Sequence, residues 1–210
     1  MNRHERRKQK KINNFTSNLH NELLKAIQLH TSKEYKNAEN LYKQIIVKEP
    51  NNYDALRHLG ILHQDLGNYE EAYNNYLKCI TIKPNGFEAL NNLGAVHVRN
   101  KNYQLALKCF NRSYEVNQNY VPTINNLASL YHKLNRPREA LNMSSKAIKM
   151  HPNNLITLNQ HAKALILNND IAEAMKLLEK YHKAFPEHED FALNLSTAYK
   201  EMGDFEKSNK

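Results

Sequence analysis

The sequence predicts an all-α fold built as a stack of helical hairpins, and two columns of small residues are the main evidence. Alanine recurs at a spacing of 34 residues, at Ala38, Ala72, Ala106, Ala140 and Ala174. A second column, twelve positions earlier, holds Ala26, Gly60, Gly94, Ala128 and Ala162. No insertion or deletion interrupts this period, so the chain consists of repeats. Small residues at fixed positions predict one close helix-on-helix crossing in every repeat.

Large apolar residues follow the same period. Leucine precedes the small residue at Leu59, Leu93, Leu127 and Leu195, and a large residue follows the alanine at Tyr42, Tyr76, Phe110 and Leu178. This spacing predicts two amphipathic helices of roughly 12–14 residues in each repeat. Breaks such as Gly67-Asn68 separate paired helices, and closing pairs such as Pro50-Asn51 end one helix and cap the next.

These columns resemble those of the tetratricopeptide repeat. The third repeat carries them as Ala89-Leu90-Asn91-Asn92-Leu93-Gly94, followed by Tyr103, Ala106 and Phe110. The resemblance implies a right-handed superhelical solenoid of helix-turn-helix hairpins over residues 19–210. The expected units are 19–52, 53–86, 87–120, 121–154, 155–188 and an incomplete 189–210, after a basic, disordered tail over 1–18.

Some positions depart from the repeat pattern. Lys25 and His161 stand in the leucine column, and Ser144 stands in the aromatic column. We expect these residues to weaken packing locally without shifting the register. The sixth unit stops where its second helix should run, which favours a chain that is truncated or that continued into further repeats or a catalytic domain in its relatives.

Composition and motifs argue against catalysis. The chain is 24% charged and 40% hydrophobic, with no apolar run near 18 residues, so we expect a cytoplasmic protein without a membrane span. No phosphate-binding loop, nucleophile elbow or His-Glu-x-x-His motif occurs. The pattern assigns Cys79, Cys109, His63 and His97 to packing positions. We therefore expect no enzyme activity, no cofactor and no metal site.

Two neighbouring columns of polar residues remain unexplained by packing. One holds His58, Asn92, Asn126, Gln160 and Asn194, and the other includes Asn91 and Asn125. The first helices of stacked hairpins line the concave face, so these residues predict a ladder of amides along an inner groove. Amides donate and accept hydrogen bonds and can pair with the backbone of an extended peptide. The alternative is that asparagine is simply abundant in this chain.

The predicted ladder sharpens the resemblance. It is similar to the Asn-lined groove of tetratricopeptide arrays attached to O-linked N-acetylglucosamine transferases, which hold extended protein substrates. The few charges expected beside it (Arg99, Lys133, Lys163 and Lys200) favour an acidic partner segment. Members that dock chaperone tails need Lys and Arg at set groove positions, and the matching positions here are mostly Asn, Ala, Ser and Ile.

The beginning of the chain is basic. Residues 1–11 hold six of the 30 Lys and Arg residues and one of the 21 acidic ones. The six are Arg3, Arg6, Arg7, Lys8, Lys10 and Lys11. Such a block is usually a solvated arm, and it can also contact nucleic acid or an anionic surface. A basic start followed by these repeats resembles bacterial proteins whose repeats precede a sulfotransferase or glycosyltransferase domain.

The sequence therefore favours a non-catalytic scaffold that binds an extended segment of another protein in an Asn-lined groove. The alternative is the N-terminal, substrate-targeting part of a transferase whose catalytic domain lies outside this chain. RNA binding by helical repeats is a third hypothesis, and the nearly neutral, Asn-rich columns argue against it.

Overall fold

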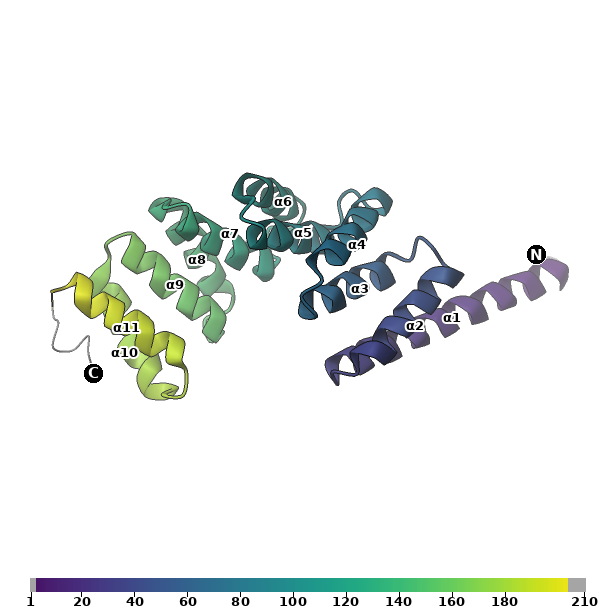
Figure 1. Ribbon diagram of the computed structural model, residues 1–210, viewed down its shortest axis with the longest axis horizontal. Coiled ribbons are helices and arrows are strands. Elements are labelled where there is room, and N and C mark those ends of the chain that lie inside the picture. The colour runs from purple at the N-terminus through teal and green to yellow at the C-terminus, as the bar shows by residue number, and fades with distance from the viewer. Residues whose placement is uncertain (1–2, 204–210) are drawn as a thin grey trace. The chain divides into compact units, whose positions relative to one another are not determined.

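A computed structural model of the chain describes residues 3–203, apart from the side chains of residues 3, 4, 7 and 11–15. In this described part eleven α-helices follow one another without a strand between them (Figure 1). The contacts divide the chain into two compact units, Met1–Asn100 and Lys101–Lys210. The division falls in the turn between the two helices of the expected repeat 87–120, and each unit is described by itself.

The first unit contains five helices that pair as the columns predict. They are α1 (Arg3–Thr31), α2 (Tyr35–Lys48), α3 (Tyr53–Asp65), α4 (Tyr69–Ile82) and α5 (Phe87–Arg99). Helix α1 packs on α2 and α3 packs on α4, while α2 contacts α3 and α4 contacts α5. The first helices also touch one another, because α3 lies against both α1 and α5. The predicted hairpins are thus present in this unit.

The close crossing expected at the small-residue column is visible at Gly60. A methyl group on Gly60 would lie 2.6 Å from Cε1 of Tyr76, which is shorter than any normal carbon contact. Tyr76 is fully buried, and its hydroxyl donates to Oε1 of Gln64 at 3.0 Å. In the preceding hairpin, Ala26 occupies the same column and belongs to one apolar cluster with Tyr42. Gly60 thus leaves the space that the Tyr76 ring occupies, whereas Ala26 fits in the cluster with Tyr42.

The second unit contains six helices. They are α6 (Tyr103–Val116), α7 (Val121–Lys133), α8 (Pro137–Met150), α9 (Leu155–Leu167), α10 (Ile171–Ala184) and α11 (Glu189–Glu201). Helices α7 and α8 form one hairpin and α9 and α10 the next. The first helices lie side by side, since α9 contacts both α7 and α11. Leu158, Leu178 and Phe191 lie in the core that joins these last hairpins.

One turn position repeats a left-handed backbone in every hairpin. The positive φ values are 63° at Lys33, 79° at Gly67, 59° at Lys101, 53° at Asn135, 68° at Asn169 and 79° at Gly203. Glycine and asparagine adopt this conformation readily, whereas a lysine there pays a steric cost. Elsewhere asparagine caps helices, since Asn52 Oδ1 accepts from the backbone N–H of Ala55. The turn chemistry thus supports the 34-residue register.

Two residues that depart from the repeat pattern meet in the second unit. Ser144 of α8 is fully buried, His161 of α9 is 8% exposed, and Ser144 Oγ lies 3.0 Å from His161 Nδ1. The corresponding positions elsewhere join a large residue to leucine, as in the cluster that holds Tyr42 and Leu59. A small polar residue and a large polar one thus replace an apolar pair, and each satisfies the other.

The basic segment at the start of the chain differs from the disordered arm expected over residues 1–18. Helix α1 begins at Arg3 and continues through this segment. Residues 3–18 contain no glycine or proline and are rich in Arg, Lys, Gln and Glu, which favour helix. Arg6, Lys8 and Lys10 are exposed, while the side chains of Arg3, Arg7 and Lys11 lie outside the described residues. Contact of this segment with nucleic acid or an anionic surface stays a prediction.

The expected second helix of the sixth unit falls in residues 204–210, which lie outside the described part. Between residues 3 and 203, no helix is both long and apolar enough to cross a membrane.

Candidate functional site

The predicted site residues all lie on first helices of hairpins. They are His58 on α3, Asn91 and Asn92 on α5, Asn125 and Asn126 on α7, Gln160 on α9 and Asn194 on α11. The first three belong to the first unit and the other four to the second. Their hydrogen bonds and burial divide them into residues that bond to a neighbouring helix and residues that line a hollow at the surface.

In the first unit, His58 is a packed neutral imidazole. Its ring stacks on Tyr42, with the ring centroids 6.1 Å apart and the planes 10° from parallel. Burial, together with the neighbouring Arg57 charge, lowers the pKa of His58 to about 4. Nε2 lies 3.0 Å from Nη2 of Arg57, which can only donate, so Nε2 accepts. His58 therefore fills a packing position with its polar tip occupied.

The two amides of α5 interact with each other. Asn91 is only 5% exposed, and its Nδ2 donates to Oδ1 of Asn92 at 3.3 Å. Asn92 itself is half-buried. In the same unit Arg99, one of the charges expected near the groove, lies over the ring of Tyr69 at 5.2 Å from its centroid. Asn91, Asn92 and Arg99 thus each interact with another side chain of the protein.

In the second unit, amide side chains tie the first helices to one another. Asn125 of α7 donates from Nδ2 to Oγ1 of Thr157 on α9 at 3.2 Å. Asn194 of α11 donates from Nδ2 to Oδ1 of Asn159 on α9, and both asparagines are buried. Hydrogen bonds between buried groups leave little freedom to either helix. The amide columns thus hold α7, α9 and α11 in register.

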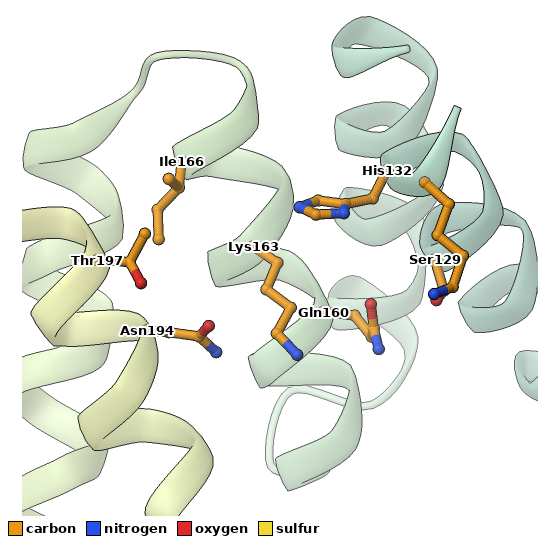
Figure 2. A pocket seen from close by; sticks show the side chains of 8 residues that line it. Ser129, His132, Gln160, Lys163, Ile166, Asn194 and Thr197 are labelled. Carbon is orange, nitrogen blue, oxygen red and sulfur yellow. The ribbon is translucent and has the colours of Figure 1, made fainter. Parts of the chain in front are cut away.

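A hollow of about 360 Å³ opens on this surface of the second unit. It is lined by Ser129, His132 and Lys133 of α7, Gln160, Lys163 and Ile166 of α9, and Asn194 and Thr197 of α11. Figure 2 shows Lys163 extending from α9 with its amine between the side chains of Asn194 and Gln160. Within the described residues, Gln160 and Lys163 have no hydrogen-bond or ion-pair partner. The structure therefore brings Gln160 and Asn194 together beside a free lysine.

Two further hollows lie along α9. A hollow of about 200 Å³ between α9 and α11 shares Gln160 and Lys163 with the first one and adds Ile156. A third, of about 420 Å³ between α7 and α9, contains Asn125 and Asn126 and is also lined by Ile156. Each hollow thus shares a lining residue with the next one along α9. We call them together the α9 groove.

The α9 groove is electropositive. Lys133 and Lys163 line it, and Asp190 is the only carboxylate among its described lining residues. Burial lowers the pKa of His132, and the charges of Lys163 and Lys133 lower it further. The imidazole is therefore neutral near pH 7 and offers one donor and one acceptor. An anionic ligand would meet two cations and a neutral polar group here.

Sequence reasoning did not predict the apolar part of the groove. Ile156, on the first helix α9, is 67% exposed and lines two of the hollows. The position of Ile156 is acidic in three other repeats, as Asp54, Glu88 and Asp190, and is Pro122 in the repeat before it. The available signal was an isoleucine at a position that is acidic in half of the repeats, which becomes visible only when the residues of that column are compared.

The reactive residue types lie at packing positions. Cys79 is buried, and burial raises the pKa of its thiol to about 12. Cys109 is half-buried, and burial also raises the pKa of its thiol. Both thiols are therefore protonated at neutral pH and poor nucleophiles. His63 and His97 are buried as expected, and burial lowers the pKa of each. Among the described residues no three His, Cys, Asp or Glu side chains could hold a metal ion together.

The fold and this surface define a helical repeat protein with an exposed polar groove. Models of the tetratricopeptide repeat match residues 41–74, 87–152 and 165–209, and a TPR repeat model matches residues 65–101. The matches together cover well over half of the chain. The chain belongs to the tetratricopeptide repeat family, as the column pattern predicted.

Solved structures of the same fold resemble the chain at low sequence identity. A tetratricopeptide repeat protein from Parabacteroides merdae ATCC 43184 is 18% identical, with a TM-score of 0.74 over 91% of this chain and 76% of that one. PilF of Pseudomonas aeruginosa is 15% identical, with a TM-score of 0.78 over 91% and 87%. YrrB, described as a TPR protein with an unusual peptide-binding site, is 19% identical, with a TM-score of 0.66 over 80% and 86%. No curated protein matches the sequence. The predicted all-α solenoid fold is thus confirmed.

Proposed function

We propose that the chain is a non-catalytic scaffold that binds an extended segment of another protein in the α9 groove. The observation that carries the proposal is the free Gln160 amide beside the free Lys163 in a hollow between three first helices. An amide that makes no hydrogen bond within the protein can donate to and accept from the backbone of a ligand. The peptide-binding site named for YrrB lends support from the same fold.

An extended backbone suits the groove in chemistry and in length. Each peptide unit exposes one N–H and one C=O, and a glutamine amide can pair with both. Packed helices lie about 8–10 Å apart, so the span from α7 across α9 to α11 is roughly 20 Å. At about 3.3 Å per residue, this span accommodates about six residues of extended chain.

The cross-helix amide bonds prepare the groove for binding. Asn125 with Thr157 and Asn159 with Asn194 hold the three helices that carry the lining side chains. A surface that is already ordered loses little conformational entropy when a ligand binds. In this proposal Asn125, Asn159 and Asn194 position the helices. Gln160 and Asn126 line the groove in which the ligand would lie.

The proposal is tested by selecting peptides from a randomised phage-displayed library on the full chain and measuring their Kd by fluorescence anisotropy. The combined substitution of Asn126→Ala and Gln160→Ala should weaken the selected peptides at least fivefold, since each removes donors and acceptors for a backbone. Asn111→Ala with Asn142→Ala, on the second helices α6 and α8, is the matched control and should bind as the parent does. Failure to select any peptide, or equal affinity in the two double variants, contradicts the proposal.

A second proposal keeps the same groove in a different setting, in which the repeats present protein substrates to a sulfotransferase or glycosyltransferase. Its support is the column of amides on the first helices. The test is co-purification of the tagged chain with a transferase encoded in the same cells, compared with the Asn126 and Gln160 double variant. Loss of a transferase with that variant supports the proposal, and recovery of none contradicts it.

A further inference from the structure

We propose that the α9 groove selects a segment with an Asp or Glu side chain at Lys133 and Lys163 and an apolar side chain at Ile156. This inference rests on the proposed function and adds the chemistry of the ligand. It draws on three observations: unpaired positive charge at one end of the groove, an exposed isoleucine at the other, and the distance between them along one helix.

The positive charge at the first end has no counter-charge on the helices that carry it. Helices α7 and α9, each of 13 residues, contain no aspartate or glutamate. A few cations of the described chain pair with carboxylates, such as Lys48 with Glu22 at 2.6 Å and Arg57 with Asp54 at 3.2 Å. Lys133 and Lys163 have no such pair among the described residues. A carboxylate between them would form charge-assisted hydrogen bonds, which are the stronger kind.

The apolar end of the groove is centred on Ile156. This side chain is 67% exposed and lines the hollow between α9 and α11 and the hollow between α7 and α9. Val121 and Pro122 of α7 line the hollow on one side, and Leu155 and Phe191 line the hollow on the other. An apolar side chain placed here would remove Ile156 from water, which is favourable at about 25 cal/mol per Å² buried. The hollows therefore suit one aliphatic or aromatic residue of the ligand.

The separation of the two ends sets a spacing in the ligand. Ile156 and Lys163 are seven residues apart on α9, which is two helical turns and places them on one face. At about 1.5 Å per residue this separation is roughly 10 Å. An extended chain covers that distance in about three residues. The expected pattern is an apolar residue and an acidic residue three positions apart, within one position either way.

Asp190 helps to fix which residue binds at which end. Asp190 lies in the first turn of α11 and lines the hollow between α9 and α11, as Ile156 does. Its negative charge would repel an acidic side chain placed beside Ile156 and leaves the Lys133 end as the favoured place. The carboxylate is that of a side chain, because Gln160 flanks Lys163 and offers hydrogen bonds to a backbone that continues past it.

The experiment begins with random nonapeptides displayed inside a phage coat protein, so that none ends in a free carboxylate, selected on the full chain. Selected peptides should carry Asp or Glu two to four positions from Leu, Ile, Val, Met or Phe. A capped synthetic peptide of the selected sequence should bind about tenfold more weakly after its acidic residue is changed to the amide. Lys163→Met and Lys133→Met should each weaken it about tenfold, whereas Lys176→Met on α10, an exposed control, should not.

The outcomes separate this inference from the proposed function. If peptides are selected without an acidic position, or if Lys163→Met and Lys133→Met bind as Lys176→Met does, the charge assignment is wrong while peptide binding stands. If no peptide is selected, the proposed function itself fails. Loss of the acidic preference in the lysine variants, with unchanged melting temperatures, supports the assignment. Ile156→Ser should remove the preference for an apolar residue, and an unchanged preference overturns that half of the inference.

Discussion

The buried pair formed by Ser144 and His161 should respond to substitution as one unit. Replacing Ser144 with alanine leaves Nδ1 of His161, a residue 8% exposed, without its partner at 3.0 Å. An unsatisfied buried polar group costs about 1–3 kcal/mol, so Ser144→Ala should lower the free energy of unfolding by that amount. The hydroxyl also lies 3.1 Å from the carbonyl oxygen of Leu141, a bond within α8 that adds little.

The same substitution should cost less when the imidazole is absent. In a His161→Leu background there is no Nδ1 to leave unsatisfied, and leucine is the residue of this column in other repeats. Ser144→Ala should then cost less than about 1 kcal/mol. The double-mutant cycle should therefore give a coupling of about 1–2 kcal/mol between the two side chains. Urea unfolding followed by far-ultraviolet circular dichroism at pH 7.5 measures the four free energies.

The pair should also make stability depend on pH. Burial lowers the pKa of His161 below its ordinary value near 6.5. Between 6.5 and the lowered pKa the unfolded chain binds more protons than the folded one, so stability falls as pH falls through this window. One such group contributes at most about 1.4 kcal/mol per pH unit. His161→Leu should lose less stability than the parent between pH 7 and pH 5. A coupling of zero together with identical pH slopes would refute this account of the pair.

Two further predictions concern turns and helix contacts. Lys33→Gly should raise the free energy of unfolding by up to about 1 kcal/mol, because φ at this turn is 63° and left-handed backbone favours glycine. Gly67→Ala, at φ 79° with open space around it, should lower it by about 1 kcal/mol, and thermal unfolding that ranks the two variants the other way contradicts the prediction. Asn159→Ala should cost about 1–3 kcal/mol by leaving the buried Asn194 without its acceptor. Amide hydrogen exchange should then quicken in α11. Asn153→Ala is an exposed control, and an equal loss of stability in that variant would argue against a stabilising bond between Asn159 and Asn194.

Much of the fold could be predicted because the repeat pattern is local and redundant. Small, apolar and turn residues recur at the same positions of successive hairpins. A departure at one position therefore cannot shift the register. Gly60 was predicted to lie at a close crossing, and it lies against Tyr76. The helix through residues 3–18 was not predicted, since a basic segment without apolar periodicity is compatible with either a helix or a solvated arm.

The candidate site was predicted as columns of residues without their individual roles. All seven polar residues were correctly assigned to first helices. Which amides are open to a ligand depends on partners from neighbouring helices, such as Asn159 for Asn194 and Thr157 for Asn125. Such pairs are about 32–35 residues apart in sequence, and their side-chain rotamers follow from packing rather than from the pattern.

The sequence by itself determined the family, the hairpins and the register, because burial of apolar residues at helical spacing acts within and between adjacent helices in the same way in every repeat. Only the tertiary structure decided that His58 is a packed neutral ring, that Ser144 and His161 complete each other, and which amides hold helices together. It also decided that Gln160, Lys163 and Ile156 share one groove. These outcomes depend on distances between side chains of different helices, and a hydrogen bond or an unpaired charge is defined only when those distances are known.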